Sequence, residues 1–360
     1  MAELNADRSS PPPSRQVWRA ALLVGLIGLL AAACSHAADA AAGPPASLPF
    51  APAAFTSSDS VLIVSPHPDD ESLCCAGLIR RALAQGARVS IIWVTGGDAF
   101  ELDARLVELR LRPGPVGLRK LGERRVAEAM EAADRLGVPP ANRYLLGYPD
   151  RGIQRLMLDH FFVPYRSPYT GETSVAFPNA LSPKAPYEGR ALDADLRKVI
   201  ALTAPTYVFV ASPLDAHPDH STSGEFVMRI MGERGQLDRV YYWIVHGGFE
   251  WPFPRGLHRK LDLIPPERAR DLPWMRFELT DAEQNTKLAA LQAHRSQVEI
   301  MRRFLYAFVR RNEIFTRVAL EPEAPVPLLT PEAQGQSEGQ GDSPNEGPYE
   351  GESREESGAR

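Results

Sequence analysis

Short apolar runs alternate with a helical segment between residues 61 and 94 of this 360-residue chain. Residues 61–64 and 88–94 are rich in the β-branched and aromatic residues that strands favour. Residues 71–85 between them carry apolar side chains at helical spacing, and Gly86 follows as a stop signal. Strand, helix and strand within about 35 residues form a βαβ unit, which requires a parallel sheet.

The same alternation continues along the chain. It predicts strands at 143–146, 207–211 and 240–245, and helices at 122–136, 194–203 and, as one or two helices, 281–315. We therefore expect an α/β protein with a Rossmann-like three-layer fold and a mainly parallel sheet, in a single catalytic domain. In such a sheet, functional sites lie at the carboxyl ends of the strands, beside a change in strand order.

The N-terminal segment has the layout of an export signal. Two arginines precede an apolar or small-residue stretch over residues 20–33, which is short for a membrane span. Residues 29–34 resemble a bacterial lipobox that ends in Cys34, the residue that is then lipidated, although Ala31 stands where such boxes usually have Leu. Plain cleavage without lipidation and an uncleaved anchor are the alternatives.

These features divide the chain into four predicted segments. They are a signal peptide of the lipoprotein type at 1–34, an Ala/Pro-rich tether at 35–57, the catalytic domain at 58–330 and an acidic, disordered tail at 331–360. The net charge of the whole chain is −5, and eight acids against two bases in the tail leave the rest near neutral. A near-neutral body excludes a nucleic-acid binder, which needs a basic surface.

Two segments that begin with His-Pro-Asp each follow a predicted strand. The first runs from His67 to Glu71 as His-Pro-Asp-Asp-Glu, and the second runs from His217 to His220 as His-Pro-Asp-His. A lone histidine at a strand end is usually a core residue, and a lone acidic run usually begins a helix. Two such clusters at the same edge of a sheet instead indicate titratable groups that converge on one site.

The two segments together contain the residue types that bind a metal. Two imidazoles and one carboxylate are enough for a catalytic zinc site, with water in the remaining position. His67 leaves the strand end and Asp70 follows on the first helical turn, so both can reach one ion, whereas Asp69 points elsewhere and stays free as a base. Cys74 and Cys75 lie further along, where we expect small buried side chains and no mutual disulfide.

Together the two segments resemble those of the PIG-L/LmbE-like family of zinc-dependent de-N-acetylases. That family includes glucosaminyl-phosphatidylinositol deacetylases and the deacetylases of mycothiol and bacillithiol synthesis. Further similarity lies in residues 122–128, 136–138, 146–150 and 287–297, so the resemblance extends from about residue 61 to about residue 315. It implies one Zn²⁺ per chain, held by His67, Asp70 and His220.

The resemblance also implies how the other site residues act. A water on the zinc would be the nucleophile, with Asp69 as its general base. His217 would stabilise the oxyanion, and Asp219 would orient the ring of His217. The leaving amine would take a proton from the acid form of Asp69 or from His217, and the sequence does not choose between them.

Arg125 and Asp150 match positions that contact sugar hydroxyls in the family, so the resemblance implies that they bind substrate. A surface salt bridge from Arg125 to Glu128, three residues on, explains the arginine equally well. Gly96-Gly97-Asp98 follows the strand at 88–94 and therefore lies near the same edge of the sheet, where its glycines can simply make a turn.

The resemblance implies a hydrolase of linear amide C–N bonds that removes an acetyl group from an N-acetylated amino sugar of the GlcNAc type. With the export signal, this predicts an enzyme of the bacterial cell envelope: a membrane-anchored lipoprotein, or otherwise a periplasmic or secreted protein. Its partner is a small-molecule or glycan substrate, with no nucleic acid and no membrane contact beyond the N-terminal anchor or signal. The alternatives are an exported metal-dependent amidase for a non-sugar amide and a non-catalytic glycan-binding lipoprotein.

Overall fold

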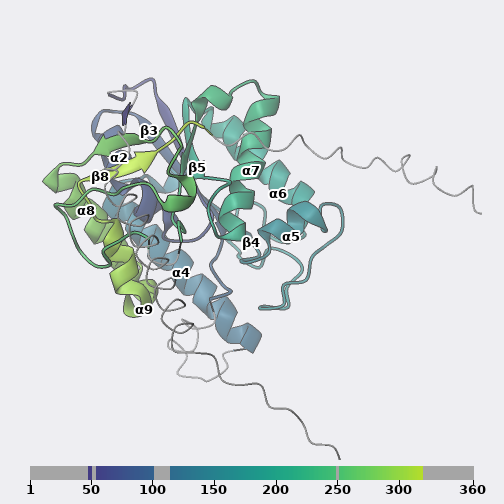
Figure 1. Cartoon of the computed structure of the whole chain (residues 1–360). Helices are drawn as coiled ribbons and strands as arrows, with labels where there is room; N and C mark the ends of the chain where they lie inside the picture. Colours follow the sequence, from purple (N-terminus) through teal and green to yellow (C-terminus); the bar gives the residue numbers. More distant parts are fainter. Residues whose placement is uncertain (1–47, 51–53, 101–113, 249–250, 319–360) are drawn as a thin grey trace, which may run out of the picture. The chain divides into compact units, whose positions relative to one another are not determined.

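The computed structural model describes residues 48–50, 54–100, 114–248 and 251–318, and it confirms the α/β fold (Figure 1). Five parallel strands form the main sheet in the order β4-β3-β2-β5-β6. Every residue of the central strand β2 is buried, because helices cover both faces of the sheet. The strands are β2 (Ser60–Ser65), β3 (Arg88–Thr95), β4 (Arg143–Tyr148), β5 (Tyr207–Ala211) and β6 (Val240–Trp243).

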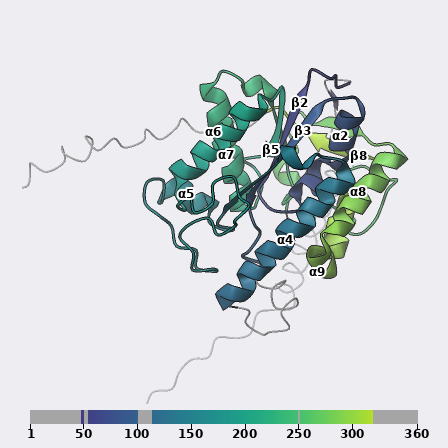
Figure 2. The same ribbon diagram turned by 180° about the vertical axis from the view of Figure 1, so that it is seen from behind.

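Two groups of helices complete the three layers. On one side of the sheet lie α2 (Asp70–Ala84), α4 (Gly114–Leu136), α8 (Asp281–Ala293) and α9 (Arg295–Leu305) (Figures 1 and 2). On the other side lie α5 (Ile153–Leu158), α6 (Gly189–Thr203) and α7 (Pro218–Glu233). The helix expected at 281–315 is therefore two helices that meet at His294, and the second is kinked at Met301.

A small second sheet lies outside the expected pattern. It has the order β1-β7-β8 and contains β1 (Leu48–Pro49), β7 (Met275–Glu278) and β8 (Asn312–Phe315). The helical expectation was thus wrong over β8, because antiparallel pairing with β7 outweighs the local pattern there. Helix α7, which begins at the second His-Pro-Asp segment, was also not predicted.

The two adjacent cysteines were predicted only in part. Cys74 and Cys75 are buried in α2, as expected, but their sulfur atoms are bonded to each other, so the expectation of no mutual disulfide was wrong.

Several predicted segments fall outside the described residues. These are the signal peptide at 1–34 with Cys34, most of the tether at 35–57 and the tail at 331–360. Among the helices that the structure describes, none combines the length and the apolar character needed to cross a bilayer.

Candidate functional site

The two His-Pro-Asp segments meet at the carboxyl edge of the main sheet. Strands β2 and β5 are neighbours; the chain runs outward from β2 through β3 and β4, and on the opposite side from β5 to β6. The strand order therefore changes between β2 and β5, which is where α/β sheets form a crevice. One segment joins β2 to α2, and the other joins β5 to α7.

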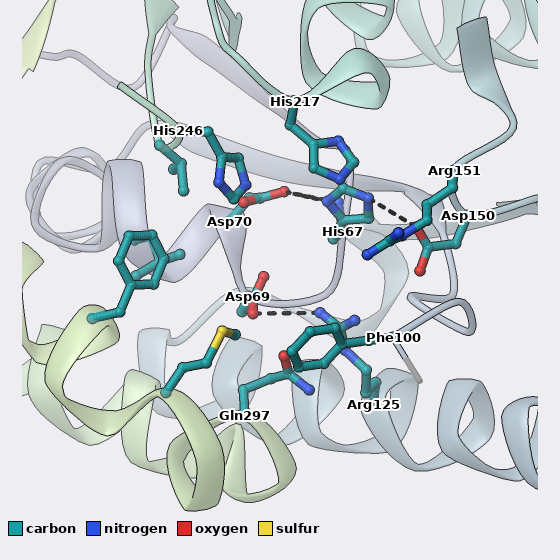
Figure 3. Close-up of a pocket in the computed structure, with 14 residues that line it drawn as sticks. His67, Asp69, Asp70, Phe100, Arg125, Asp150, Arg151, His217, His246 and Gln297 are labelled. Atoms are coloured by element: carbon teal, nitrogen blue, oxygen red, sulfur yellow. Dashed lines mark hydrogen bonds and ion pairs between the residues drawn. The ribbon is translucent and has the colours of Figure 1, made fainter. Parts of the chain in front are cut away.

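His67 lies at the centre of a cluster of polar side chains (Figure 3). Its Nδ1 is 3.0 Å from Nε2 of His220 and 3.5 Å from Oδ2 of Asp70. Its Nε2 is 3.2 Å from Oδ1 of Asp150 and 3.3 Å from Oδ2 of Asp219. These carboxylates accept a hydrogen bond from Nε2, so the ring proton is on Nε2. The lone pair of Nδ1 is therefore free to bind a metal and points toward the other expected ligand atoms.

His220 repeats this arrangement. Its Nε2 is 3.2 Å from Oδ2 of Asp70, and its Nδ1 is 3.3 Å from Oδ2 of Asp215. Three backbone N–H groups donate to the carboxylate of Asp215 and hold it in place. A carboxylate behind each imidazole, at the ring nitrogen that faces away from the centre, is the arrangement that metal-binding histidines adopt.

The three expected ligand atoms fit a zinc ion. Nδ1 of His67, Oδ2 of Asp70 and Nε2 of His220 are separated by 3.0, 3.2 and 3.5 Å. Ligand atoms at about 2.0–2.1 Å from a tetrahedral zinc lie about 3.3 Å from one another. Two imidazole nitrogens that face each other also need a proton or a cation between their lone pairs. The donor set therefore suits a divalent metal of the zinc type.

Buried carboxylates dominate the electrostatics of this cluster. Burial lowers the pKa of His67, yet the charge of Asp150 and the hydrogen bonds to the carboxylates raise it well above its usual range overall. Burial also lowers the pKa of His220, but the charges of Asp70 and Asp215 raise it to about 9. The cluster thus favours positive charge at its centre, and a divalent cation would supply it.

Asp69 lines the cavity, and its carboxylate lies apart from the side chains of His67 and Asp70 (Figure 3). Its Oδ2 is 3.4 Å from Nη2 of Arg125. Burial raises the pKa of Asp69 to about 6, although the charge of Arg125 opposes this shift. A carboxyl group with a pKa near neutrality, next to the ligand cluster, has the properties of a general base.

Arg125 belongs to the cavity and not to the protein surface. Its Nη1 donates to the carbonyl of Gly97 at 3.0 Å, and its Nη2 donates to the carbonyl of Pro68 at 3.2 Å. Glu128 pairs with Arg124 instead, at 3.0 Å. The explanation of Arg125 as a surface salt bridge is therefore wrong.

His217 lines the cavity as a neutral ring. Its Nδ1 accepts a hydrogen bond from the backbone N–H of Asp219 at 3.2 Å, so its proton is on Nε2. Burial, followed by the charges of His67 and His220, lowers the pKa of His217 to about 2. These three imidazoles are close enough to form a metal-binding group, but a protonated Nε2 makes His217 a hydrogen-bond donor and not a ligand.

Two carboxylates make contacts other than those expected. Asp219 does not orient His217 with its side chain; it contacts His67 and accepts the backbone N–H of Arg151 at 2.6 Å. Asp150 lines the cavity, as a substrate-binding residue should, but its carboxylate also lies against His67 and accepts the backbone N–H of Ala99 at 2.8 Å. Both carboxylates are therefore placed to orient the His67 ring.

The cavity encloses about 170 Å³ and includes several residues that sequence reasoning missed. His246 lies just beyond the carboxyl end of β6, where sites in such sheets are expected, so it could have been predicted. The cavity residues of α9 could not be predicted in this way, because only tertiary packing brings that helix to the edge of the sheet. The missed residues are Phe100, Arg151, His246, Gln297, Met301 and Phe304 in the cavity wall, and Asp215 behind His220.

Residues 62–231, which include both His-Pro-Asp segments, match the profile of the family described as PIG-L: GlcNAc-PI de-N-acetylase. This match to the PIG-L family covers residues 62–231, a little under half of the chain. The chain also resembles named relatives. The 1D-myo-inositol 2-acetamido-2-deoxy-alpha-D-glucopyranoside deacetylase of Actinosynnema mirum is 26% identical over 261 residues, which are 68% of this chain and 83% of that protein.

Two further matches differ in the share of the chain that they cover. The protein of the same name from Segniliparus rotundus is 39% identical over 87 residues, which are 24% of this chain and 26% of that protein. The chain thus spans about a quarter of that relative's length. Among solved structures, N,N'-diacetylchitobiose deacetylase from Pyrococcus horikoshii aligns over 71% of this chain and 82% of its own, at 20% identity and a TM-score of 0.43.

Proposed function

We propose that this protein is a zinc-dependent hydrolase of the PIG-L type that removes the acetyl group from an N-acetylated amino sugar of the GlcNAc type. One observation carries the proposal: His67, Asp70 and His220 converge within 3.5 Å of one another, with Asp69 free beside them. The description of the family and the names of the relatives support the hydrolysis of an amide on an acetamido sugar.

The chemistry divides among a few residues. His67, Asp70 and His220 would hold zinc, which would supply the Lewis acidity that makes water nucleophilic at neutral pH and polarises a carbonyl group. Asp69 takes the proton of the attacking water. His217 donates from Nε2 to the amide oxygen as that oxygen becomes negative. Asp69 then returns its proton to the leaving amine, because the neutral His217 uses its single ring proton on the oxyanion.

Other side chains position these groups. Arg125 holds the loop that carries Asp69 through the carbonyl of Pro68, and its charge favours the ionised form of that base. Asp150 and Asp219 fix the ring of His67. Water and the amide are consumed and acetate and a free amine are produced, so no further reactant is required.

The test combines metal analysis of the purified protein with amine release from a panel of N-acetylglucosamine conjugates. We expect about one zinc per chain and release of free amine. Asp69→Ala should keep zinc and lose turnover, whereas His220→Ala should lose both. Normal turnover by Asp69→Ala would refute the assignment of the base.

Two other outcomes would redirect the proposal. Zinc without amine from any sugar conjugate would favour a different amide substrate or a glycan-binding protein without turnover. No zinc, even after zinc is supplied, would overturn the ligand assignment.

We also propose that the protein is exported to the cell envelope and lipidated at Cys34. The apolar stretch at 20–33 and the lipobox-like residues 29–34 at its end support this. Mass spectrometry of the mature N-terminus tests it: an acylated Cys34 is expected, and a mature chain that begins at any other residue would remove the lipoprotein assignment.

A further inference from the structure

The catalytic cavity is too small for the whole of a conjugated substrate. It encloses about 170 Å³, whereas sites for drug-sized ligands hold about 300–1,000 Å³. A second hollow of about 720 Å³ adjoins it, and Met301 and Phe304 of α9 line both spaces. A molecule with its acetamido group at the ligand cluster can therefore extend past these two side chains into the second hollow, which we call the α9 groove.

A stack of planar groups joins the two spaces. The ring of Phe304 lies parallel to that of His246, with centroids 6.1 Å apart, and His246 lines the catalytic cavity. The guanidinium carbon of Arg255 lies 4.6 Å from the centroid of the same Phe304 ring. Arg255 lines the groove, so the stack runs from the metal-ligand cluster to the groove wall.

The α9 groove is basic. Its polar lining consists of three guanidinium groups, from Arg255, Arg302 and Arg303, against the single carboxylate of Glu299. Arg302 and Arg303 are exposed and form no ion pair with any described residue, and Glu299 lies 3.8 Å from Arg124. Two arginine forks are thus available to an incoming group, and the guanidinium fork matches a carboxylate or a phosphate.

We propose that the α9 groove binds the part of the substrate beyond the amino sugar, and that this part carries an anionic group, a carboxylate or a phosphate, which Arg302 and Arg303 recognise. The proposal rests on the proposed deacetylase function and adds the substrate class. A conjugate with its negative charge on the aglycone is the preferred substrate, and a neutral conjugate of the same shape is a poorer one.

The experiment compares two substrates that differ by one charge. They are the 4-(carboxymethyl)phenyl glycoside of N-acetylglucosamine and its neutral methyl ester, assayed by amine release with the zinc-loaded full chain. Because Arg302 and Arg303 are exposed, their ion pairs with the substrate are moderate in strength, and kcat/KM for the acid should exceed that for the ester by roughly fivefold. Added salt should reduce this preference, since the groove is open to solvent.

Two matched double variants test whether Arg302 and Arg303 cause the preference for the acid substrate. Arg302→Gln/Arg303→Gln should lower the acid-to-ester ratio to near one. The control Lys198→Gln/Arg234→Gln removes the same charge from exposed positions on α6 and at the C-terminal end of α7, and it should keep the wild-type ratio. An equal loss in both variants would show that net charge alone sets the ratio, and would overturn the inference.

The outcomes separate this inference from the function on which it rests. If both substrates are deacetylated with equal kcat/KM, the anion subsite is wrong and the deacetylase proposal stands. If neither the two glycosides nor any other N-acetylglucosamine conjugate releases amine, the proposed function fails and the inference fails with it.

Discussion

Asp69 is held in an unusual backbone conformation. Its φ of 139° lies in a region that side chains other than glycine rarely adopt, and such strain costs about 1–3 kcal/mol. Its carbonyl accepts the N–H groups of Ser72 and Leu73, each at 3.0 Å, and its own N–H donates to Glu71 at 3.2 Å. The first turn of α2 thus fixes the conformation that keeps the Asp69 carboxylate apart from the expected metal ligands.

This strain predicts a trade-off between stability and activity. Asp69→Gly and Asp69→Asn should each lower kcat by about a hundredfold or more, because both remove the proposed base. Asp69→Gly should nevertheless have a free energy of unfolding about 1 kcal/mol higher than Asp69→Asn, since glycine tolerates a positive φ. Urea unfolding of the two variants measures the difference, and equal stability would mean that the conformation is not strained.

Asp98 is a second carboxyl group that burial perturbs. Burial, together with the charge of Asp150, raises the pKa of Asp98 from 3.8 to about 7. Between these two pH values the folded state binds more protons than the unfolded state, so this group reduces stability as the pH rises through that window. Asp98→Asn should therefore raise Tm by several degrees near pH 8 and by much less near pH 4. A gain of the same size at both pH values would exclude ionisation as its cause.

Single residues could be predicted where a short motif follows a strand. His67, Asp69 and Asp70 lie within four consecutive residues where the loop after β2 enters α2, so their placement could be expected from spacing. Asp215 and Phe304 could not, since each reaches the site through contacts made by the completed fold. The orientation of Asp219 was also misjudged, because the backbone N–H groups after β4 attract its carboxylate away from His217.

Helix α8 is tied to two other elements by a fully buried ion pair. Nζ of Lys287 lies 2.8 Å from Oε1 of Glu313 in β8, and both side chains are completely inaccessible to solvent. Glu313 also accepts the backbone N–H groups of Gly77 and Leu78 in α2, at 2.9 and 3.0 Å. The carboxylate of Glu313 therefore joins helices α2 and α8 to strand β8 of the small sheet.

Removing one partner of this pair should be more harmful than removing both. Glu313→Gln leaves the Lys287 charge buried without a counter-ion, and we expect it to lower the free energy of unfolding by about 3–5 kcal/mol. Lys287→Met/Glu313→Gln should recover much of that loss, because no charge remains buried. Urea unfolding measures the free energy of unfolding of both variants. If the double variant is no more stable than Glu313→Gln, the unpaired Lys287 charge does not cause the loss of stability.

Elements with a strong local pattern were predicted well, and those defined by pairing were not. The strand at 61–64 has apolar residues on both faces, and the helix at 71–85 ends at a glycine, so each carries its own signal. The four residues of β8 carry no such signal; their strand conformation comes from β7, where Phe277 pairs with Glu313. The small sheet could therefore be known only from the folded chain.

At the scale of the whole molecule, the site depends on a strand order that the sequence does not reveal. Alternating strands and helices predicted a parallel sheet, but not that β5 would lie beside β2, where Val61 pairs with Tyr207, 146 positions further along the chain. That pairing brings the loop before α2 against the start of α7. The expected ligands thus come from two distant parts of the chain, and a bound metal would join them.

This arrangement predicts that zinc stabilises the global fold and not only the loop around it. A ligand that binds only the native state at a hundred times its Kd adds about 2.7 kcal/mol of stability. For a domain of this size that corresponds to a rise in Tm of roughly 5–10 °C. Chelator-treated protein should therefore melt lower by this amount, and added zinc should restore Tm and activity together. His220→Gln should show no zinc-dependent shift, whereas the surface variant Arg234→Gln should keep the full shift. A full shift in His220→Gln would place the stabilising metal elsewhere in the chain and separate it from the proposed catalytic site.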